Sequence, residues 1–398
     1  MSVPANPRLA EVWAPYMEWA KCHPRPRFDL CGSNLAACTI DDLPGARDLI
    51  APNGDNDHGY GPLVEAIASF YGVTRDDVAL GAGASGANFL VMAALLSPGD
   101  EVLVERPVYD PLPGAARLLG AKVRSFERRF DHAWELDPEA VAAAISPRTR
   151  LVVVTHPHNP TGVALDDVAL AALAALADTH GLHVLVDEVY LDTLAPRPAA
   201  AATRHPRLIS TSSLTKSYGL AGLRAGWLLA APDVAAAARR VRGTVEAIGA
   251  FPGELLAALA FRHIEALAAR AHAILAPGRR KLEDFVESRQ ELEWVPPAGG
   301  TVGFPRLLGV DDAGPFIEKL LADFDTSVVP GRFFGAPAHF RIAFGGEPAT
   351  LDGGLEQIGR ALDALGTTPG QRGGRPRSGS VSAAAAASSS GSSKRSAS

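Results

Sequence analysis

Four short stretches of the sequence carry side chains suited to chemistry on an aldehyde and a phosphate. They are THPHNPTG (155–162), VDEVY (186–190), SSLTK (212–216) and GLRAG (222–226). Their chemical groups are an amide, a carboxylate, a phenol, a hydroxyl, an amine and a guanidinium, on Asn159, Asp187, Tyr190, Ser213, Lys216 and Arg224. An amine can form a Schiff base, a carboxylate can keep a pyridine nitrogen protonated, and a guanidinium can bind a phosphate. Pyridoxal phosphate needs this combination of groups from a protein.

Each of these residues alone also has an ordinary structural explanation. Asp187 could cap a helix, Asn159 before Pro160 could form a turn, and a single lysine such as Lys216 is most often solvated. Tyr190 could be a core residue, and Arg224 could form a surface ion pair. The order of the motifs, each at the end of an expected strand, favours a pyridoxal phosphate site over these separate explanations.

The segments that must position these side chains alternate between strand and helix. Expected strands are apolar runs at 77–83, 100–107, 150–157, 183–190 and 207–213, and expected helices lie at 61–72, 84–96 and 166–181. Continuous apolar strands separated by helices predict an α/β fold, a three-layer αβα large domain with a mostly parallel sheet. Ligands of such folds bind beyond the carboxyl ends of the strands, where the four motifs fall.

The pattern changes after residue 232. Residues 233–289 are rich in Ala and Arg with a helical period, for which we expect one long helix and a second. Strand-like runs around a predicted helix at 313–324 then indicate a smaller α+β domain. Four parts are predicted. Residues 1–50 form a segment that packs with the small domain, and residues 51–232 form a large cofactor-binding domain. Residues 233–366 form the small domain with its linking helix, and residues 367–398 form a disordered tail rich in Gly, Ser and Ala.

Composition restricts the class of protein. Hydrophobic residues are 47% and charged residues 21% of the chain, which is typical of a globular protein. The net charge of −6 argues against a general nucleic-acid binder, and no apolar run is long enough for a membrane span. The first residues lack a signal-peptide pattern and the few cysteines suggest a reducing compartment, so we expect a cytoplasmic protein. We expect no metal site.

The stretch GAGASG (81–86) leaves an alternative function open. It matches the G-x-G-x-x-G fingerprint of dinucleotide binding, and Glu105 follows at about the spacing of the acidic ribose contact. These glycines show only that backbone approaches an anion at a helix N-terminus, or packs tightly. An NAD-dependent oxidoreductase is therefore an alternative to a phosphate loop for pyridoxal phosphate.

The four motifs in this order, with FRIAF (340–344), resemble the class I/II aminotransferases of the fold-type I pyridoxal-phosphate superfamily, over roughly residues 25–365. The resemblance implies a homodimeric aminotransferase that moves an amino group from an amino acid to a 2-oxo acid. It implies that Lys216 forms the aldimine with the cofactor and moves a proton, and that Asp187 pairs with the ring nitrogen. Asn159 and Tyr190 would bond the phenolate oxygen. A lyase or decarboxylase of the same fold remains an alternative.

The resemblance also implies roles for further residues. Ser213 and Arg224 would bind the phosphate with the backbone N–H groups of Ala84 and Ser85. Tyr109 would stack on the cofactor ring, and Arg341 would clamp the substrate α-carboxylate. The stretch DLCGSNLAAC (29–38) resembles the family's substrate-site segment, which makes Asn34 a candidate substrate contact, although Ser33-Asn34 replaces the common glycine-centred pattern.

Two further positions stay open. The family has a tyrosine that reaches the phosphate of the neighbouring subunit. In this sequence Tyr60 lies directly before Gly61, and Asn56 holds the expected offset.

His156 and His158 flank the asparagine motif, and we interpret them as packed, hydrogen-bonded histidines. The substrate side chain and the amino acceptor are not predicted.

Overall fold

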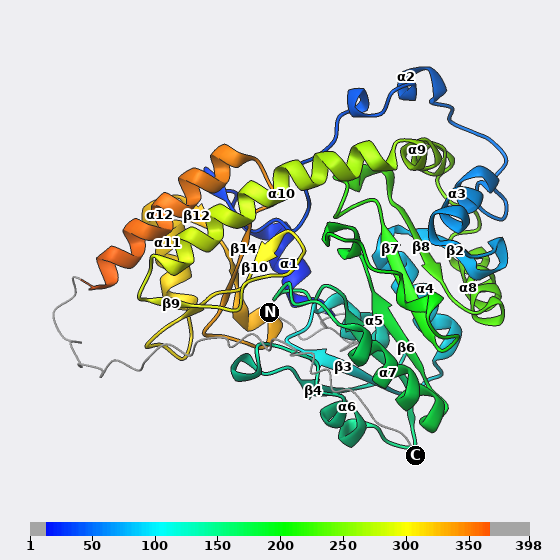
Figure 1. Ribbon diagram of the computed structural model, residues 1–398, viewed down its shortest axis with the longest axis horizontal. Coiled ribbons are helices and arrows are strands. Elements are labelled where there is room, and N and C mark those ends of the chain that lie inside the picture. Colours follow the sequence, from blue (N-terminus) through cyan, green and yellow to red (C-terminus); the bar gives the residue numbers. More distant parts are fainter. Residues whose placement is uncertain (1–12, 367–398) are drawn as a thin grey trace, which may run out of the picture.

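A computed structural model describes residues 13–366 of the chain (Figure 1). A large unit built on a seven-stranded sheet lies beside a smaller unit, and the long helix α10 (Ile264–Glu287) runs from one to the other. Among the described residues, no helix combines the length and apolar character needed to cross a membrane. The predicted tail at 367–398 lies outside the described residues.

The large sheet is mostly parallel, which confirms the predicted fold class. Its strands, in spatial order, are β2 (Val78–Ala82), β8 (Ala225–Leu229), β7 (Leu208–Ser213), β6 (His183–Asp187), β5 (Thr149–Thr155), β3 (Glu101–Arg106) and β4 (Lys122–Glu127). Strand β8 is antiparallel to both neighbours, while β7, β6, β5, β3 and β4 pair in parallel. The carboxyl ends of β5, β6 and β7 therefore meet at one edge.

Helices cover both faces of this sheet. One face packs against α4 (Gly83–Leu95), α5 (Pro111–Leu118) and α8 (Pro232–Val245). The other face packs against α3 (Gly61–Tyr71), α6 (Pro138–Ala144), α7 (Asp167–His180) and α9 (Phe251–Arg262). Strand β5 shows why its sequence is continuously apolar: Leu151 and Val153 belong to the first core, and Val152 and Val154 to the second.

The smaller unit is an α+β arrangement around strand β14. Its strands are β1 (Phe28–Asp29), β9 (Leu292–Glu293), β10 (Val302–Gly303), β11 (Arg306–Leu307), β12 (Thr326–Ser327), β13 (Val329–Pro330) and β14 (Phe340–Ala343). Strand β14 lies between β10 and β13 in an antiparallel sheet. Helices α10, α11 (Gly314–Phe324) and α12 (Pro348–Gly366) enclose one core with this sheet.

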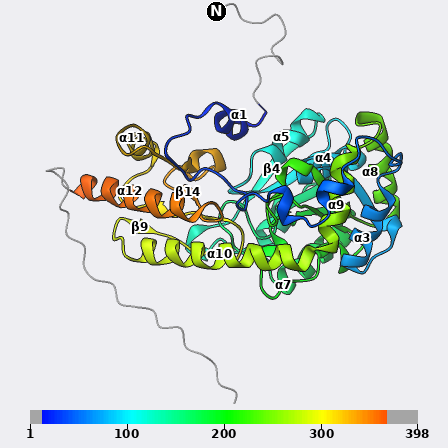
Figure 2. The same cartoon turned by 90° about the horizontal axis from the view of Figure 1, so that it is seen from above.

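The N-terminal segment connects the two units. Helix α1 (Pro15–Cys22) lies between them in Figure 2, and its Tyr16 N–H donates to Asp110 Oδ2 in the large unit at 2.6 Å. Further along, Leu30 and Leu35 pack in the core of the smaller unit. Leu43 and Ala46, the latter in the short helix α2 (Ala46–Leu49), pack in the core of the large unit. The segment therefore crosses from one unit to the other within a few residues.

One sequence expectation about the helices was wrong. Residues 233–289 form parts of three helices, α8, α9 and α10, rather than one long helix and a second. Helix α9 begins anew at Phe251, with Pro252 in its first turn where the missing N–H costs nothing. Helix α10 begins directly after His263, which ends α9 outside helical geometry. The Ala-rich composition concealed these breaks because alanine favours helix everywhere.

Candidate active site

Lys216 lies just beyond the carboxyl end of β7. Its Nζ donates a hydrogen bond to Ser33 Oγ at 2.7 Å. Burial, with the positive charges of Arg341 and Arg224, lowers the pKa of Lys216 to about 7, while Asp187 acts in the opposite direction. A large share of the amine is therefore neutral near pH 7, as a nucleophilic lysine requires.

Asp187 is the last residue of the neighbouring strand β6, and its side chain is buried. Its Oδ2 accepts from Asn88 Nδ2 at 2.8 Å, and its Oδ1 accepts from the Val189 N–H at 3.2 Å. Asn88 is oriented in turn by Thr211, whose Oγ1 donates to Asn88 Oδ1 at 2.5 Å. Burial raises the pKa of Asp187, and these hydrogen bonds and the charge of Lys216 oppose that rise.

The first turn of α4 offers backbone N–H groups to an anion. This helix starts at Gly83 and includes Ala84 and Ser85, and its N-cap residue makes no side-chain cap hydrogen bond. Helix N-termini of this kind attract negative charge through their dipole and unpaired N–H groups. The Arg224 guanidinium lies close by, because a Cβ added at Gly83 would fall 2.4 Å from Arg224 Nη2.

Glycines let β8 approach the start of this helix. A Cβ on Gly226 would fall 2.2 Å from the Gly83 carbonyl carbon, so no larger residue fits there. Ser213 pairs with Gly226 in the sheet and is buried, with its Oγ accepting from the Thr215 N–H at 3.3 Å. Arg224 adopts the left-handed region at φ 51°, which is uncommon for a residue with a Cβ. Strain of this kind tends to gather at functional sites.

Arg341 lies in β14 of the smaller unit and is fully buried. Its Nη1 donates to Asn159 Oδ1 at 3.2 Å, and its Nη2 donates to Tyr16 Oη at 2.6 Å and to the Cys31 carbonyl at 3.0 Å. Its Nε has no hydrogen-bond partner. A buried guanidinium with an unpaired N–H is suited to a ligand carboxylate, since leaving such a donor unpaired is costly.

The two predicted aromatic residues lie in the same region. Tyr190 is buried, and its hydroxyl donates to the Ser33 carbonyl at 3.1 Å. Tyr109 follows β3 and donates to Met17 Sδ at 3.3 Å, with its ring edge against Tyr16 at 6.0 Å. The structure thus gathers residues of both units around Lys216.

Three residues of this region were not predicted as site residues. Ser33 contacts the amine, Tyr16 contacts Arg341, and Asn88 contacts Asp187. Asn34, the predicted substrate contact, is exposed, whereas its neighbour Ser33 is buried. The one signal in the sequence that pointed to Ser33 was the departure from a glycine-centred pattern at Ser33-Asn34. Tyr16 and Asn88 belong to no motif, and only the fold brings them to the site.

The structure does not support the dinucleotide interpretation of GAGASG. Glu105, the expected ribose contact, is buried beneath the strand ends, 1% exposed. Its carboxylate pairs with Arg128 at 3.2 Å and accepts from the Thr155 N–H at 2.6 Å. Burial raises the pKa of Glu105 to about 7. A carboxylate bound in this way cannot reach a ribose, so Glu105 is a structural residue.

The open positions and the two histidines all make contacts within the chain. Asn56 is buried, and its Nδ2 donates to Glu254 Oε2 at 3.1 Å, while the Tyr60 N–H donates to the same oxygen at 2.8 Å. His156 Nδ1 accepts from the Leu165 N–H at 3.0 Å. His158 bonds Thr161 Oγ1 at 2.7 Å through Nδ1. The two histidines are therefore packed and hydrogen-bonded, which confirms their interpretation.

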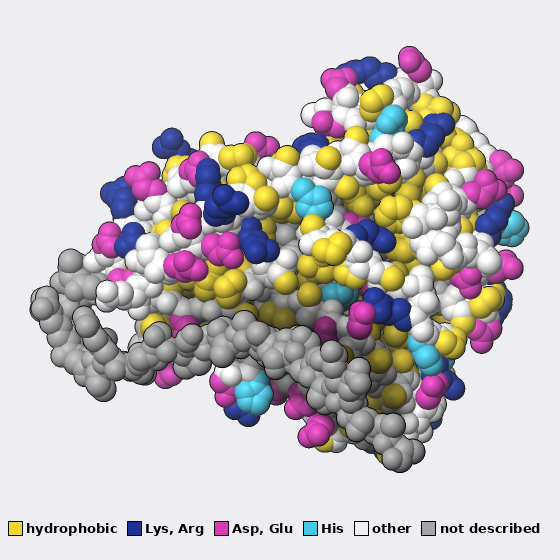
Figure 3. Space-filling model, viewed as in Figure 1, with side chains coloured by type: hydrophobic (Ala, Val, Ile, Leu, Met, Phe, Trp, Pro, Cys, Tyr) yellow, Lys and Arg dark blue, Asp and Glu magenta, His cyan; other side chains and the backbone are white. Residues whose placement is uncertain are grey.

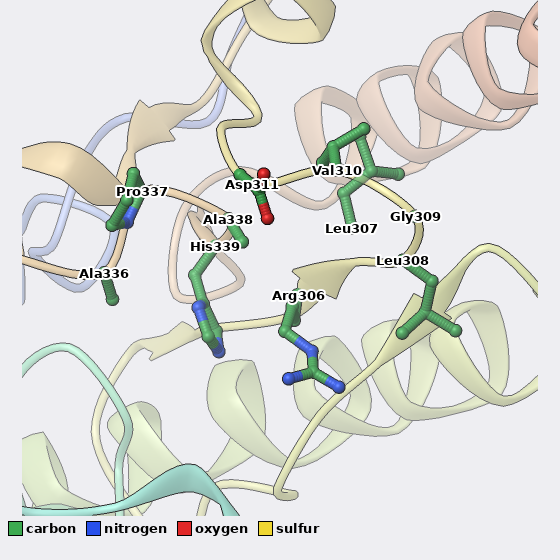
Figure 4. A pocket seen from close by; sticks show the side chains of 10 residues that line it. All are labelled: Arg306, Leu307, Leu308, Gly309, Val310, Asp311, Ala336, Pro337, Ala338 and His339. Carbon is green, nitrogen blue, oxygen red and sulfur yellow. The ribbon is translucent and has the colours of Figure 1, made fainter.

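A cavity of about 710 Å³ lies on the smaller unit, away from these residues (Figure 4). It is lined by 306–311 and 336–339, and includes none of the predicted site residues. The Arg306 guanidinium at its edge is already engaged, with Glu293 at 2.6 Å and the Phe130 ring at 4.6 Å. Within 13–366, no group of three or more His, Cys, Asp or Glu side chains could hold a metal ion.

Comparison with known proteins identifies a family model and relatives that match most of the chain. The family model described as aminotransferase class I and II matches residues 54–358. Capreomycidine synthase from Streptomyces vinaceus is 35% identical over 283 residues, 70% of this chain and 73% of that protein. The arginine–pyruvate transaminase of Pseudomonas aeruginosa is 30% identical over 288 residues, 69% of this chain and 72% of that protein.

Solved structures are similar over nearly the whole described chain. A PLP-dependent aminotransferase from Streptococcus suis has a TM-score of 0.83 at 26% identity, covering 92% of this chain and 99% of that one. The PLP-dependent cyclase OrfR has a TM-score of 0.81 at 27% identity, covering 91% of this chain and 100% of that one. The similarity therefore includes both units and the segment between them.

Proposed function

We propose, from the premise that this chain belongs to the class I and II aminotransferase family, that it transfers an amino group from an amino acid to a 2-oxo acid. Its cofactor is pyridoxal 5'-phosphate, the cofactor of this family. One observation carries the proposal for the site: the Lys216 amine and the Asp187 carboxylate stand at the ends of adjacent strands and influence each other's pKa values.

The residues of the chain fit the three parts of the cofactor. When bound, pyridoxal phosphate supplies an aldehyde that condenses with amines and a pyridine ring that accepts electrons. Lys216 is the amine for the aldehyde, and Asp187 is the carboxylate that holds the ring nitrogen protonated. The first turn of α4 and Arg224 hold the phosphate, with Ser213 beside them at the end of β7. Asn159, Tyr190 and Tyr109 remain proposed cofactor contacts.

Lys216 also moves the proton. In its neutral form the Lys216 amine would accept the proton from the substrate α-carbon, and the electron-accepting ring of the bound cofactor would take up the electron pair. As the ammonium, Lys216 would then donate this proton back, and pyridoxal phosphate would keep the amino group once water hydrolyses the bond between the nitrogen and the substrate carbon. A pKa of about 7 suits both halves of this task, because the group accepts and donates with similar ease near neutral pH.

Arg341 orients the substrate. Its free Nε–H is available to an α-carboxylate, and its position in the buried strand β14 fixes the direction of this donor. Holding the carboxylate fixes which bond of the α-carbon faces Lys216. The contact with Asn159 couples the substrate group to the cofactor side of the site.

The test is a visible spectrum of the purified protein loaded with pyridoxal phosphate and titrated with a panel of amino acids. The donor is the amino acid that bleaches the band of the lysine-bound cofactor and forms its 2-oxo acid. Arginine and pyruvate belong in the panel, because one relative is named for them. A protein that forms no band, or transfers no amino group from any donor, contradicts the proposal.

A second candidate is a synthase or cyclase reaction that uses the same α-proton step. The observation that favours it is the similarity to capreomycidine synthase and to the cyclase OrfR. In that case the band changes with the amino acid, but the nitrogen is not passed to a 2-oxo acid and a rearranged product accumulates. A lyase would release ammonia and a decarboxylase carbon dioxide, so product analysis separates all four outcomes.

A further inference from the structure

The amine of Lys216 has a hydroxyl partner that comes from a distant part of the chain. Ser33 Oγ accepts from Lys216 Nζ at 2.7 Å, and the two residues are 183 positions apart. Ser33 is 8% exposed, so water cannot readily replace the contact. A buried hydroxyl so close to a functional amine is either a packing feature or a device that holds the amine.

The backbone of Ser33 is fixed independently of this contact. Its carbonyl accepts from Tyr190 Oη at 3.1 Å and from Thr301 Oγ1 at 3.0 Å. These donors come from different units, and both are buried. Because the carbonyl is held on both sides, the Ser33 hydroxyl has a position of its own and does not simply follow the lysine.

The residues after Ser33 are tied to the lysine loop itself. The Leu35 N–H donates to the Lys216 carbonyl at 3.0 Å, and the Ala36 N–H donates to the Gly345 carbonyl at 2.7 Å. Arg270 Nη1 also donates to the Ala36 carbonyl at 3.0 Å. The segment therefore keeps a constant register with the loop that carries the amine.

We propose that Ser33 is a positioning residue that holds the Lys216 amine toward the substrate α-carbon whenever the amine is free. The inference rests on the proposed function and adds a residue to its proton step. A hydroxyl suits this task because it accepts a hydrogen bond from an ammonium and donates one to a neutral amine. It can therefore hold the group before and after proton transfer.

The experiment compares Ser33→Ala, Ser33→Thr and Ser217→Ala in the loaded enzyme with its donor amino acid. Ser217 is the matched control, because its buried Oγ donates to the Val189 carbonyl at 3.0 Å and not to the amine. We expect Ser33→Ala to lower kcat by about 10- to 100-fold with KM changed little, since small errors of position are expensive in proton transfer. The effect of α-deuteration on kcat should increase, and Ser33→Thr should restore much of the rate.

A second readout needs no turnover: the rate at which apoenzyme captures pyridoxal phosphate, followed by the visible band against pH. The charged groups that face the amine are Asp187, Arg341 and Arg224, and all remain in the variant. Removing an acceptor of the ammonium should move the midpoint of capture to lower pH by about half a unit to one unit. If the Lys216 amine of Ser33→Ala is neutral at a lower pH and the variant nevertheless has a lower kcat, the variant has lost the positioning of the amine. A lower basicity of the amine would not explain this combination.

Several results would overturn the inference. One is a Ser33→Ala variant whose kcat, isotope effect and capture midpoint all equal those of the wild type. Another is a loss of kcat in Ser217→Ala that equals the loss in Ser33→Ala. If Ser33→Ala does not fold, Ser33→Cys keeps the side-chain size with a weaker acceptor, and it must show the same changes in smaller degree. Failure of the wild type to form the band would instead reject the proposed function, so the two failures are distinguishable.

Discussion

The pKa values of Lys216 and Asp187 are set by opposing effects of burial and of neighbouring groups. Burial disfavours the charged form of both groups, while each favours the charged form of the other. Arg341 and Arg224 shift the balance at Lys216 toward the neutral amine. Asn88 and the Val189 N–H shift it at Asp187 toward the carboxylate. We therefore expect a neutral Lys216 amine beside the Asp187 carboxylate.

The first prediction concerns the pH dependence of cofactor capture. The pKa of Lys216 is lowered, so the reactive neutral amine gains population as the pH rises through about 7. The rate of band formation by apoenzyme should therefore rise through this pH and level off above it. In Arg341→Gln, which loses one positive neighbour, the midpoint should move to higher pH. A midpoint near that of an ordinary lysine in the wild type would refute the assignment.

The second prediction concerns the carboxylate. In Asp187→Asn the ring nitrogen loses its anionic partner, and we expect kcat to fall by about 100-fold or more while the visible band still forms. Asp178→Asn is the matched control, because this exposed carboxylate pairs with Arg207 at 2.9 Å on the surface. Asp187→Asn protein that retains kcat within a few-fold would show that the carboxylate has another role.

Sequence patterns could predict residues at strand ends but not their partners from elsewhere. Lys216, Asp187, Asn159 and Arg224 could be proposed as site residues because local motifs carry them. Ser33 could not be assigned to the amine from sequence, because its place depends on the path of the segment between the two units. The predicted substrate contact, Asn34, is exposed, while its neighbour Ser33 is buried and contacts the amine.

At the scale of elements, the phosphate end of the site depends on how closely β8 approaches α4. A Cβ at Gly226 would meet the Gly83 backbone, and a Cβ at Gly83 would meet the Arg224 guanidinium. The Gly83 N–H also donates to the Arg224 carbonyl at 2.8 Å, which fixes the arginine loop to the start of the helix. This close packing places the Arg224 guanidinium beside the first turn of α4.

The third prediction tests this packing with Gly226→Ala. The added Cβ meets backbone atoms, which cannot rotate away, so we expect a loss of about 1–3 kcal/mol in the free energy of unfolding. The dissociation constant of pyridoxal phosphate should increase as β8 moves from α4. Gly222→Ala is the matched control, since nothing lies within 4 Å of its added Cβ. Equal Tm values and affinities for the two variants would contradict this account.

The elements themselves were partly predictable. Strands β3, β5, β6 and β7 were expected within a residue or two, apart from the end of β6. Strand β8 was not predicted, because its AGWLL sequence follows a glycine-rich motif that indicated only a loop. Its direction depends on the short connection from β7, which places it antiparallel.

At the scale of the whole molecule, an apolar surface lies next to the phosphate end of the site. Ile248 and Val245 are 51% and 56% exposed, and Ile50 is 54% exposed beside α2, which contacts α9. Figure 3 shows hydrophobic side chains in the upper right of the molecule, where Figure 1 places α2, α3 and α9. A cavity of about 50 Å³ is lined by Arg224 and by residues 249–250, which directly follow Ile248.

The fourth prediction is that this surface forms a homodimer. Ile248→Glu places a charge on the apolar surface, so light scattering should show a monomer and the affinity for pyridoxal phosphate should fall. Val168→Glu is the matched control, because Val168 is 75% exposed on α7 in another part of the molecule. A wild-type protein that is monomeric at micromolar concentration would reject the proposed dimer.

The most direct test of the central claim is to find where the cofactor attaches. Borohydride reduction of the loaded protein converts a lysine-bound cofactor into a stable adduct, and peptide mass spectrometry locates it. We predict that the phosphopyridoxyl group is on Lys216, and that Lys216→Ala protein shows neither the adduct nor turnover. An adduct on another lysine, or undiminished turnover by Lys216→Ala, would contradict the account.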